Sequence, residues 1–182
     1  MGKRVIVVGG GIAGMQTALK LSAGGVSALL LECDADLGGK LTGWHKLFPS
    51  FTPAHEVLDE LRRRLAASDV EVRTRCEVAE VARDGVTLST GERLEADAVV
   101  VATGFTLFDA RIKEEYGYGI YDNVYTTVDI ERMLNEGRVA LKDGTAPRRI
   151  AFLHCVGSRD EKVCQHHCSK AVSYTHLRAH ET

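Results

Sequence analysis

Three glycines and one acid near the start of the chain have the types and spacing that a dinucleotide-binding site needs. Gly9, Gly11 and Gly14 form a GxGxxG pattern, and Glu32 follows about eighteen residues later. In this pattern the first glycine permits a tight turn, the second lets the backbone approach a pyrophosphate, and the third lets a helix pack closely on a strand. The Glu32 carboxylate can accept hydrogen bonds from both ribose hydroxyls and would repel the additional phosphate of an NADP-type ribose. These residues leave FAD and NAD as the candidate ligands.

The elements around these residues follow the order that such a site requires. Arg4 to Val8 is a β-branched apolar run typical of a strand buried on both faces of a sheet. A helix then begins at Ile12 and is stopped by Gly24 and Gly25, so that its N-terminal dipole faces the phosphates. A second strand, Ser27 to Leu31, ends in the acid. We expect the apolar side chains of the helix to rest on the sheet: Ile12, Met15, Ala18, Leu19 and Leu21.

The middle of the chain predicts a helix, a strand and an antiparallel meander. Pro53 to Ala66 is predicted as a helix that ends in three arginines, where cations complement the helix dipole and pair with acids of the preceding turn. Asp69 to Arg75 is predicted as a strand. Short alternating runs follow and are separated by Asp-Gly and Thr-Gly turns, which is typical of a meander: Val78 to Arg83, Val86 to Ser89 and Glu92 to Leu94.

The later part of the chain predicts only two further elements. Val128 to Asn135 is expected to form a short helix with Thr127 as its N-cap. Ile150 to His154 has the composition of a buried strand that would open a second nucleotide-binding half. The predicted fold class is therefore α/β: a Rossmann-like domain with a parallel sheet and an antiparallel β-meander, followed by the start of a second, truncated α/β region.

Composition limits the classes of partner. The 182 residues are 45% hydrophobic, enough for one sizeable core and the start of a second. The formal net charge is −2, and no run of like charge exceeds Arg62 to Arg64, which does not favour binding to nucleic acid or to an anionic membrane surface. The chain is predicted to have no signal peptide and no transmembrane segment.

The five cysteines do not suggest a disulfide framework. Cys33 and Cys76 are isolated, whereas Cys155, Cys164 and Cys168 lie close together near three histidines. An odd count in this arrangement suits a reducing compartment, and we expect the protein in the cytoplasm. The late cysteines and histidines are ligands that a tetrahedral zinc site accepts, although their spacing matches no short zinc knuckle. Free thiols on a loop are the alternative.

Two further motifs resemble the FAD-dependent pyridine nucleotide-disulfide oxidoreductase superfamily. They are "DLGGK" at Asp36 to Lys40 and "ADAVVVATGF" at Ala96 to Phe105, which contains a predicted core strand. In that superfamily such a loop lies beside the flavin, the ATG turn closes the FAD domain, and the residue matching Val78 offers its backbone to the adenine. The resemblance implies FAD rather than NAD alone. It makes these the expected cofactor-binding residues: Gly9, Gly11, Ile12, Ala13, Gly14, Glu32, Gly39, Lys40, Val78, Ala102, Thr103 and Gly104.

The cysteine-rich run narrows the resemblance to the A-type subunits of heterodisulfide reductases (the HdrA family) and to the related flavin subunits of quinone-interacting oxidoreductases. The family run is approximately CVGSRDE followed by CSRVCC. Cys155 to Glu161 match the first part and Cys168 to Lys170 the start of the second, within a match over about residues 3 to 170. The resemblance implies a [4Fe-4S] cluster, for which thiolates are the usual ligands. Cys155 and Cys168 are then two ligands of an incomplete set, with Cys164 an unmatched third, because Val172 and Ser173 stand where the family has cysteines.

The last residues have no counterpart in this family. "SYTHLRAHET", from Ser173, resembles translated adapter sequence at the ends of some assembled reading frames. We therefore divide the chain into an FAD-binding domain (1–106), a linker with a short helix and the start of a second redox region (107–170), and a non-native tail (171–182). A genomic continuation that encodes this tail would refute the last assignment.

The resemblance implies an amino-terminal fragment of an FAD-dependent oxidoreductase of the HdrA type, which transfers electrons. Electrons would pass between the flavin, iron-sulfur clusters and other redox subunits of a complex, towards disulfide, sulfur or quinone metabolism, with NAD(P)H or ferredoxin as the donor. No general acid or base is identified. The alternatives are a stand-alone FAD/NAD(P)H-linked disulfide oxidoreductase, which would need a CxxC or CxxxxC pair that the chain lacks, and an inactive nucleotide-binding fragment.

Overall fold

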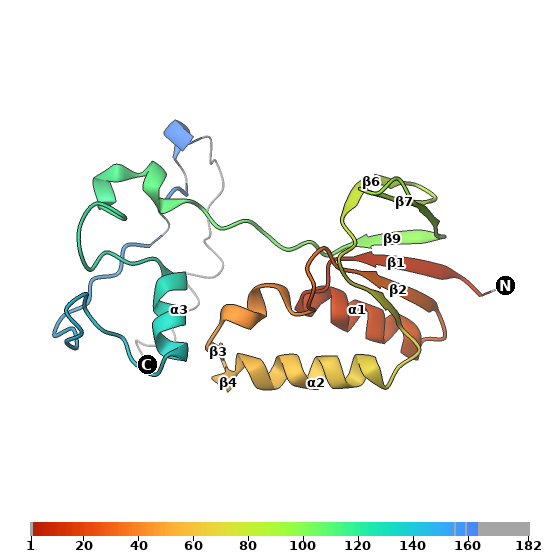
Figure 1. The fold of residues 1–182 in the computed structure, drawn as a ribbon, viewed down its shortest axis with the longest axis horizontal. Helices are drawn as coiled ribbons and strands as arrows, with labels where there is room; N and C mark the ends of the chain where they lie inside the picture. Colours follow the sequence, from red (N-terminus) through yellow and green to blue (C-terminus); the bar gives the residue numbers. More distant parts are fainter. Residues whose placement is uncertain (1, 155, 159, 164–182) are drawn as a thin grey trace. The chain divides into compact units, whose positions relative to one another are not determined.

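A computed structural model describes residues 2–154, 156–158 and 160–163 of the chain. The chain divides into two compact units, Met1–Phe105 and Thr106–Thr182. The first unit contains a parallel sheet in the order β5-β2-β1-β9 (Figure 1). Its strands are β1 (Arg4–Val8), β2 (Ser27–Leu31), β5 (Glu71–Arg73) and β9 (Ala98–Val101).

The central strands of this sheet are apolar on both faces. Residues 5 to 8 of β1 and 28 to 31 of β2 are all buried, as expected for parallel strands covered on both sides. The two strands pair in register from Arg4 with Ser27 to Val8 with Leu31. The edge strand β9 is more open than predicted, because Val101 is 61% exposed and no described strand pairs with its outer edge.

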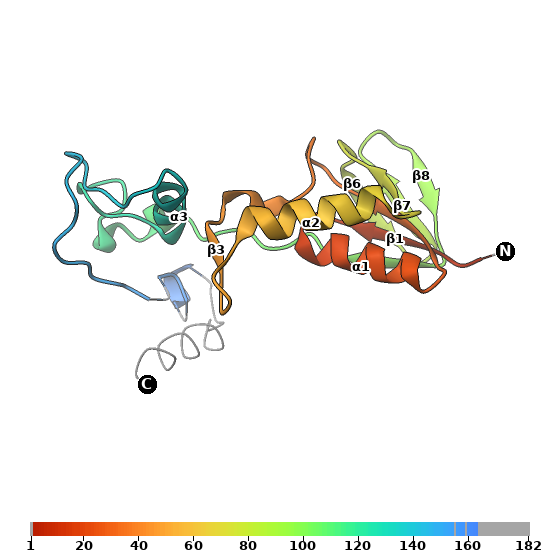
Figure 2. The same cartoon turned by 90° about the horizontal axis from the view of Figure 1, so that it is seen from below.

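Two helices cover one face of the sheet. They are α1 (Ile12–Ala23) and α2 (Ala54–Ala66), which Figure 2 shows side by side. Met15 from α1 and Leu61 from α2 are fully buried in a cluster with Val7 and Leu30 of the sheet. The prediction that Ile12 also rests on the sheet is wrong: its side chain lies in the first turn of α1 and is 40% exposed.

The predicted meander covers the opposite face. It consists of β6 (Val78–Ala82), β7 (Gly85–Leu88) and β8 (Arg93–Glu95), paired antiparallel in that order. Val86, Leu88 and Leu94 pack against Ile6 and Leu29, whose side chains point to this face of the sheet. The first unit therefore has three layers: helices, parallel sheet and meander. The predicted Rossmann-like fold is confirmed.

Shorter elements join the sheet to α2. The 3-10 helix η1 (Gly39–Gly43) is followed by β3 (Lys46–Leu47) and β4 (Thr52–Pro53), which pair antiparallel. They fill the connection between β2 and α2, so the chain after Glu32 passes close to the glycine turn before it reaches the second helix.

The described part of the second unit contains short helices. They are η2 (Ala110–Ile112), η3 (Glu114–Tyr116), α3 (Thr127–Asn135) and η4 (Glu161–Val163). The N-cap of α3 is Thr126 rather than the predicted Thr127, because the Thr126 hydroxyl accepts a hydrogen bond from the amide of Asp129 while the Asp129 carboxylate accepts one from the amide of Thr126.

The strand predicted for Ile150 to His154 is not formed. Ile150 is 61% and Phe152 74% exposed, and no described strand lies alongside to accept their backbone hydrogen bonds. An apolar run becomes a strand only where a neighbouring strand pairs with it, and this information is not local to the run.

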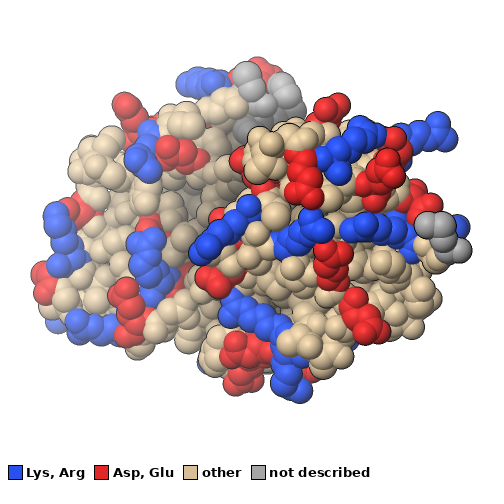
Figure 3. Space-filling view, turned by 45° about the vertical axis from the view of Figure 1, so that its right-hand side comes forward, with Lys and Arg blue, Asp and Glu red and all other residues tan. Residues whose placement is uncertain are grey.

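The surface carries both signs of charge. Lysine and arginine side chains are interspersed with aspartate and glutamate over the face drawn in Figure 3. Several of them form exposed ion pairs, such as Arg73 with Glu92 and Arg93 with Asp84. Among the described residues, no helix has the length and apolar character needed to cross a bilayer.

Candidate dinucleotide-binding site

Two of the three motif glycines are required by the protein itself. Gly9 ends β1 with a φ of +108°, and a Cβ on it would clash with the backbone carbonyl of Ala102. A Cβ on Gly14 would clash with the carbonyl oxygen of Gly9, so the absence of a side chain lets α1 pack directly against the turn. Both residues therefore build the turn from β1 to α1, as the motif predicts.

Gly11 is different, because nothing in the described protein requires it to be glycine. Its φ is −73°, which any residue can adopt, and a Cβ on it would have no heavy atom within 4 Å. It is the N-cap of α1, and no side chain caps this helix end. A ligand that approaches the backbone closely would explain the glycine, and the positive end of the helix dipole favours a phosphate there.

Glu32 is a buried acid at the carboxyl end of β2. Its side chain is 6% exposed, and its carboxylate accepts hydrogen bonds from the amide of Gly10 at 2.6 Å and from the amide of Asp34 at 2.9 Å. The Cys33 thiol donates a third at 3.1 Å. Burial raises the pKa of Glu32, but these hydrogen bonds outweigh burial and leave the pKa below its ordinary value. The acid is thus ionised beside the glycine turn.

The loop predicted to lie beside a flavin is in contact with the glycine turn. The Gly38 amide donates a hydrogen bond to the carbonyl of Gly10 at 2.9 Å, and Gly11 and Gly38 form a parallel β-bridge. A Cβ on Gly39 would lie 3.3 Å from the Cα of Gly11. The structure therefore brings together Gly11 and Gly39, two residues that the sequence separates by a strand and a helix.

The ATG turn closes the same site from the other side of β1. The Ala102 amide donates to the carbonyl of Val8 at 2.8 Å, and Gly104 has a φ of +78°, which favours glycine. After this turn, the ring of Phe105 lies under the ammonium of Lys40, with Nζ 4.9 Å from the ring centroid. This cation–π contact joins the DLGGK loop to the end of the ATG turn.

The remaining predicted cofactor residues occupy the edges of this site. Ile12 and Ala13 lie in the exposed first turn of α1. Val78 begins β6, two residues after Cys76, whose amide donates to the carbonyl of Glu32 at 2.8 Å. The meander thus starts next to the acid.

The predicted metal ligands Cys155, Cys164 and Cys168 lie outside the described residues. Cys33 and Cys76 are free thiols. Within the part of the chain that the structure describes, the only group of three residues close enough to share a metal ion is Glu32, Cys33 and Asp34. Hydrogen bonds from Cys33 and Asp34 to the Glu32 carboxylate explain why these three residues lie close together, and no metal ion is needed to explain it.

The buried side chain of Lys113 forms an ion pair with Asp160, which belongs to the sequence SRDE (residues 158 to 161) between Cys155 and Cys164. Lys113 is 6% exposed, and its ammonium pairs with Asp160 and Glu115, each at 2.6 Å. Hydrogen bonds from the Lys113 ammonium to Asp160 and then Glu115 raise its pKa and lower those of both acids. Gly157 lies against the ring of Phe108, where a Cβ would clash. Phe108 and Lys113 therefore contact two described residues between Cys155 and Cys164, Gly157 and Asp160.

Sequence reasoning missed two residues of the site. Gly10 lies between the motif glycines, and a Cβ on it would meet the side chain of Leu37 at 2.5 Å and that of Glu32 at 2.8 Å. The uninterrupted Gly9 to Gly11 run was the available signal. Arg62, interpreted as a helix-end cation, instead donates a hydrogen bond to the carbonyl of Leu37. No local pattern indicates that contact.

Parts of the chain are similar to known families and proteins. A family described as pyridine nucleotide-disulphide oxidoreductase matches residues 45–131, and an NAD(P)-binding Rossmann-like domain matches residues 7–59. The iron-sulfur A-type subunit of the CoB–CoM heterodisulfide reductase of Methanocaldococcus jannaschii is 46% identical over 84 residues, which cover 43% of this chain and 13% of the relative. An iron-sulfur A-type subunit of the same enzyme from Methanopyrus kandleri is 49% identical over 87 residues, covering 43% of this chain and 13% of the relative.

The chain is a homologue of the A-type subunits of heterodisulfide reductases. These similarities relate the matched parts of the chain to oxidoreductases. The match spans about an eighth of the length of these relatives. A solved structure of 2-methyl-3-hydroxypyridine-5-carboxylic acid oxygenase is also similar, with 23% identity over 57% of this chain and 40% of the other and a TM-score of 0.48.

Proposed function

We propose that this chain binds FAD across the glycine turn, Glu32, the 36–40 loop and the ATG turn, and that the whole protein uses the flavin to transfer electrons within a multi-subunit redox complex. The observation that supports this most directly is that the residue at position 11 is glycine although the protein has room for a side chain there. Neither its backbone conformation nor any neighbouring atom requires glycine, so a ligand lying against the backbone is the remaining reason.

The residues of the site fit the parts of FAD. The open space at the N-terminus of α1 suits the pyrophosphate, since the helix dipole and free amides favour anions. Glu32 is ionised and lies at the end of β2, where an acid can accept hydrogen bonds from ribose hydroxyls. Lys40 provides a cation on the side of the DLGGK loop that we assign to the flavin. When bound, FAD can exchange a hydride with one partner and single electrons with another.

The wider role is proposed from the relatives. Those with 44–49% identity are named as A-type subunits of heterodisulfide reductases, several of them with ferredoxin or H₂ in the name. We propose that the whole protein likewise works with other redox subunits, with ferredoxin or NAD(P)H as the donor, in the cytoplasm. Cys155, Cys168 and Cys164 remain proposed as members of an incomplete iron-sulfur ligand set. A stand-alone disulfide reductase is disfavoured, because the chain has neither a CxxC nor a CxxxxC pair.

The experiment is an FAD titration of the purified chain with Gly11→Ala as the test variant. The unchanged chain should bind one FAD and show flavin absorbance after gel filtration. Gly11→Ala should weaken FAD binding about tenfold or more, since forcing a methyl group into an occupied contact costs ~1–3 kcal/mol. Its stability without FAD should fall by no more than about 1 kcal/mol, because the added Cβ meets no protein atom and only the preference for glycine over alanine at an N-cap is lost.

Gly14→Ala is the matched control in the same motif. Its Cβ would clash with the Gly9 carbonyl, so this variant should lose stability before any ligand is added. An unchanged chain that stays colourless and does not bind added FAD would contradict the proposal and favour an inactive nucleotide-binding fragment.

A further inference from the structure

One face of α2 supports the loop that we assign to the flavin. Leu58 and Arg62 are four residues apart, so their side chains lie one above the other on the helix. The two δ-carbons of Leu58 lie 3.0 Å from the position that a Cβ on Gly38 would take. The Arg62 guanidinium donates a hydrogen bond to the carbonyl of Leu37, the preceding residue of the loop.

The other side of the same loop rests on the glycine turn. The Leu37 side chain fills the space beside Gly10, and the Gly38 amide donates to the Gly10 carbonyl at 2.9 Å. Leu37 and Gly38 are thus held between α2 and the segment that would face the pyrophosphate. A shift of the loop away from α2 would loosen its contact with Gly10 and Gly11.

The contact distinguishes Arg62 from the two arginines that follow it. Arg62 is half-buried and its donor reaches a backbone carbonyl, whereas Arg63 pairs with Glu60 on the surface of the same helix. The Arg64 side chain is exposed and has no hydrogen-bond or ion-pair partner among the described residues. Of these three arginines, Arg62 is therefore the one whose side chain binds the loop. Its hydrogen bond has a charged donor and is stronger than a hydrogen bond between neutral groups.

We propose that Arg62 is a positioning residue for FAD: it holds residues 37 to 39 against Gly10 and Gly11, so that the site is formed before the cofactor arrives. This inference rests on the proposed FAD binding and deepens it. A loop that is already ordered loses less conformational entropy on binding, which raises affinity without a direct contact between Arg62 and the ligand.

The test compares three variants of the full chain by FAD titration. Arg62→Met keeps the length of the side chain and removes the donor, and should weaken FAD binding about tenfold, the loss expected for one charge-assisted hydrogen bond. Arg62→Lys keeps a charged donor and should recover part of the affinity. Arg64→Met, the matched control on the same helix, should bind within about twofold of the unchanged chain.

Two measurements separate positioning from a general loss of structure. Hydrogen exchange of the Gly38 amide without FAD should accelerate in Arg62→Met and not in Arg64→Met, while exchange in β1 and β2 stays unchanged. Emission of Trp44, the only tryptophan and the residue after η1, should change in the same variant. The fraction of chains able to bind FAD should stay constant while the dissociation constant rises.

Equal FAD affinity and equal Gly38 exchange in Arg62→Met and Arg64→Met would overturn the role of Arg62. Faster exchange throughout the sheet in Arg62→Met, without partial recovery in Arg62→Lys, would also overturn it, since it would show a purely structural role. If the unchanged chain fails to bind FAD, the proposed function is wrong, and Gly38 exchange still decides whether Arg62 orders the loop.

Discussion

Glu32 combines burial with an ionised side chain, and the structure explains how it stays ionised. Each carboxylate oxygen accepts at least one hydrogen bond, from the amides of Gly10 and Asp34 and from the thiol of Cys33. These donors stabilise the charged form more than burial opposes it, so the pKa lies below its ordinary value. In return, the carboxylate ties the glycine turn to the end of β2. Glu32, which we propose to bind the ribose, therefore also stabilises the structure of the site before a ligand binds.

The lowered pKa of Glu32 predicts a pH dependence of stability. Since the folded pKa is below the unfolded one, the contribution of Glu32 is complete above about pH 4.5, its ordinary value, and is lost as the pH falls through the lower folded pKa. Glu32→Gln should cost about 2 kcal/mol at neutral pH, because an amide cannot accept all these hydrogen bonds. The difference in unfolding free energy between variant and unchanged chain should shrink as the pH falls below that value.

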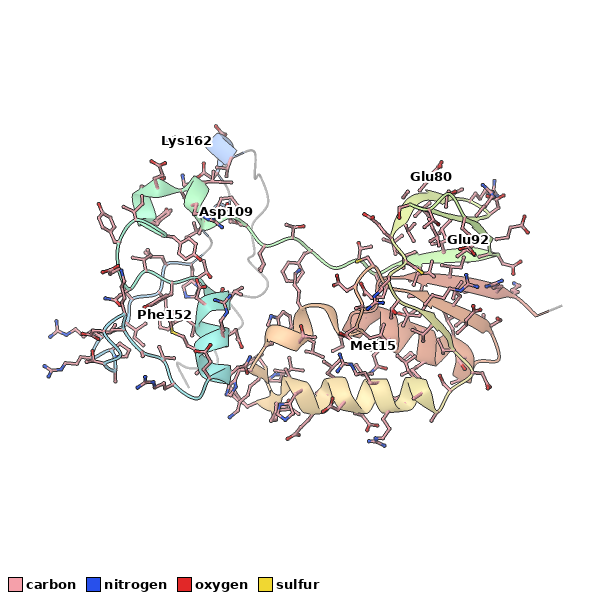
Figure 4. The ribbon with its side chains drawn as sticks, in the orientation of Figure 1. Met15, Glu80, Glu92, Asp109, Phe152 and Lys162 are labelled. Atoms are coloured by element: carbon pink, nitrogen blue, oxygen red, sulfur yellow. The ribbon has the colours of Figure 1, made fainter. Side chains whose placement is uncertain are left out.

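Glu80→Gln is the control for this measurement. Glu80 is an exposed acid on the meander (Figure 4), and its replacement removes the same charge without removing a buried hydrogen-bond acceptor. Equal pH profiles for the two variants, measured by urea unfolding, would show that the buried hydrogen bonds of Glu32 do not stabilise the folded chain.

At the scale of single elements, the structure agrees best with prediction where the signal is local. The bounds of β1, β2 and α1 match the predicted ones, because apolar runs and terminal glycines specify them directly. The start of α3 differs by one residue, since Thr126 and Thr127 are both threonines and only the reciprocal contact with Asp129 distinguishes them. The strand predicted at Ile150 to His154 fails for lack of a pairing partner among the described strands.

The two threonines give a direct test of the α3 cap. Thr126→Ala should lower the stability of α3 by about 1 kcal/mol, because the Asp129 amide loses its acceptor and the capping box is broken. Thr127→Ala should change it by no more than about 0.5 kcal/mol. Hydrogen exchange of the α3 amides measures both effects. A larger loss of protection in Thr127→Ala than in Thr126→Ala would show that Thr127 is the N-cap, as the sequence predicts.

At the scale of the whole chain, the apolar core formed by the described residues is confined to the first unit. Every buried hydrophobic residue of the described chain lies between Val5 and Leu94, and all of them except Val5 belong to two clusters on opposite faces of one sheet. In the described part of the second unit, large apolar side chains such as Phe152 remain exposed (Figure 4), while the charged side chain of Lys113 is buried. The two units should therefore differ in stability, since apolar burial is the main stabilising contribution.

Hydrogen exchange of the unchanged chain checks this difference. Amides of β1 and β2 should exchange only by global unfolding of the first unit, whereas those of α3 should exchange much faster through local opening. Added FAD should slow exchange in the first unit, since a ligand that binds only the folded state stabilises it. Similar protection in β2 and α3 would contradict the expected difference in stability.

Residue spacing along the chain was sufficient to predict the Rossmann-like domain and the meander, because each depends on short-range periodicity or on a motif within one turn. The cofactor-binding residues stay a prediction, since they rest on the glycine motif and on the family resemblance. The contacts across the site required the tertiary structure. The closeness of Gly11 and Gly39, the hydrogen bond from Gly10 to Glu32 and the hydrogen bond from Arg62 to Leu37 join residues 22 to 28 positions apart. Their positions depend on how sheet, loop and α2 pack together, and no local pattern contains that information.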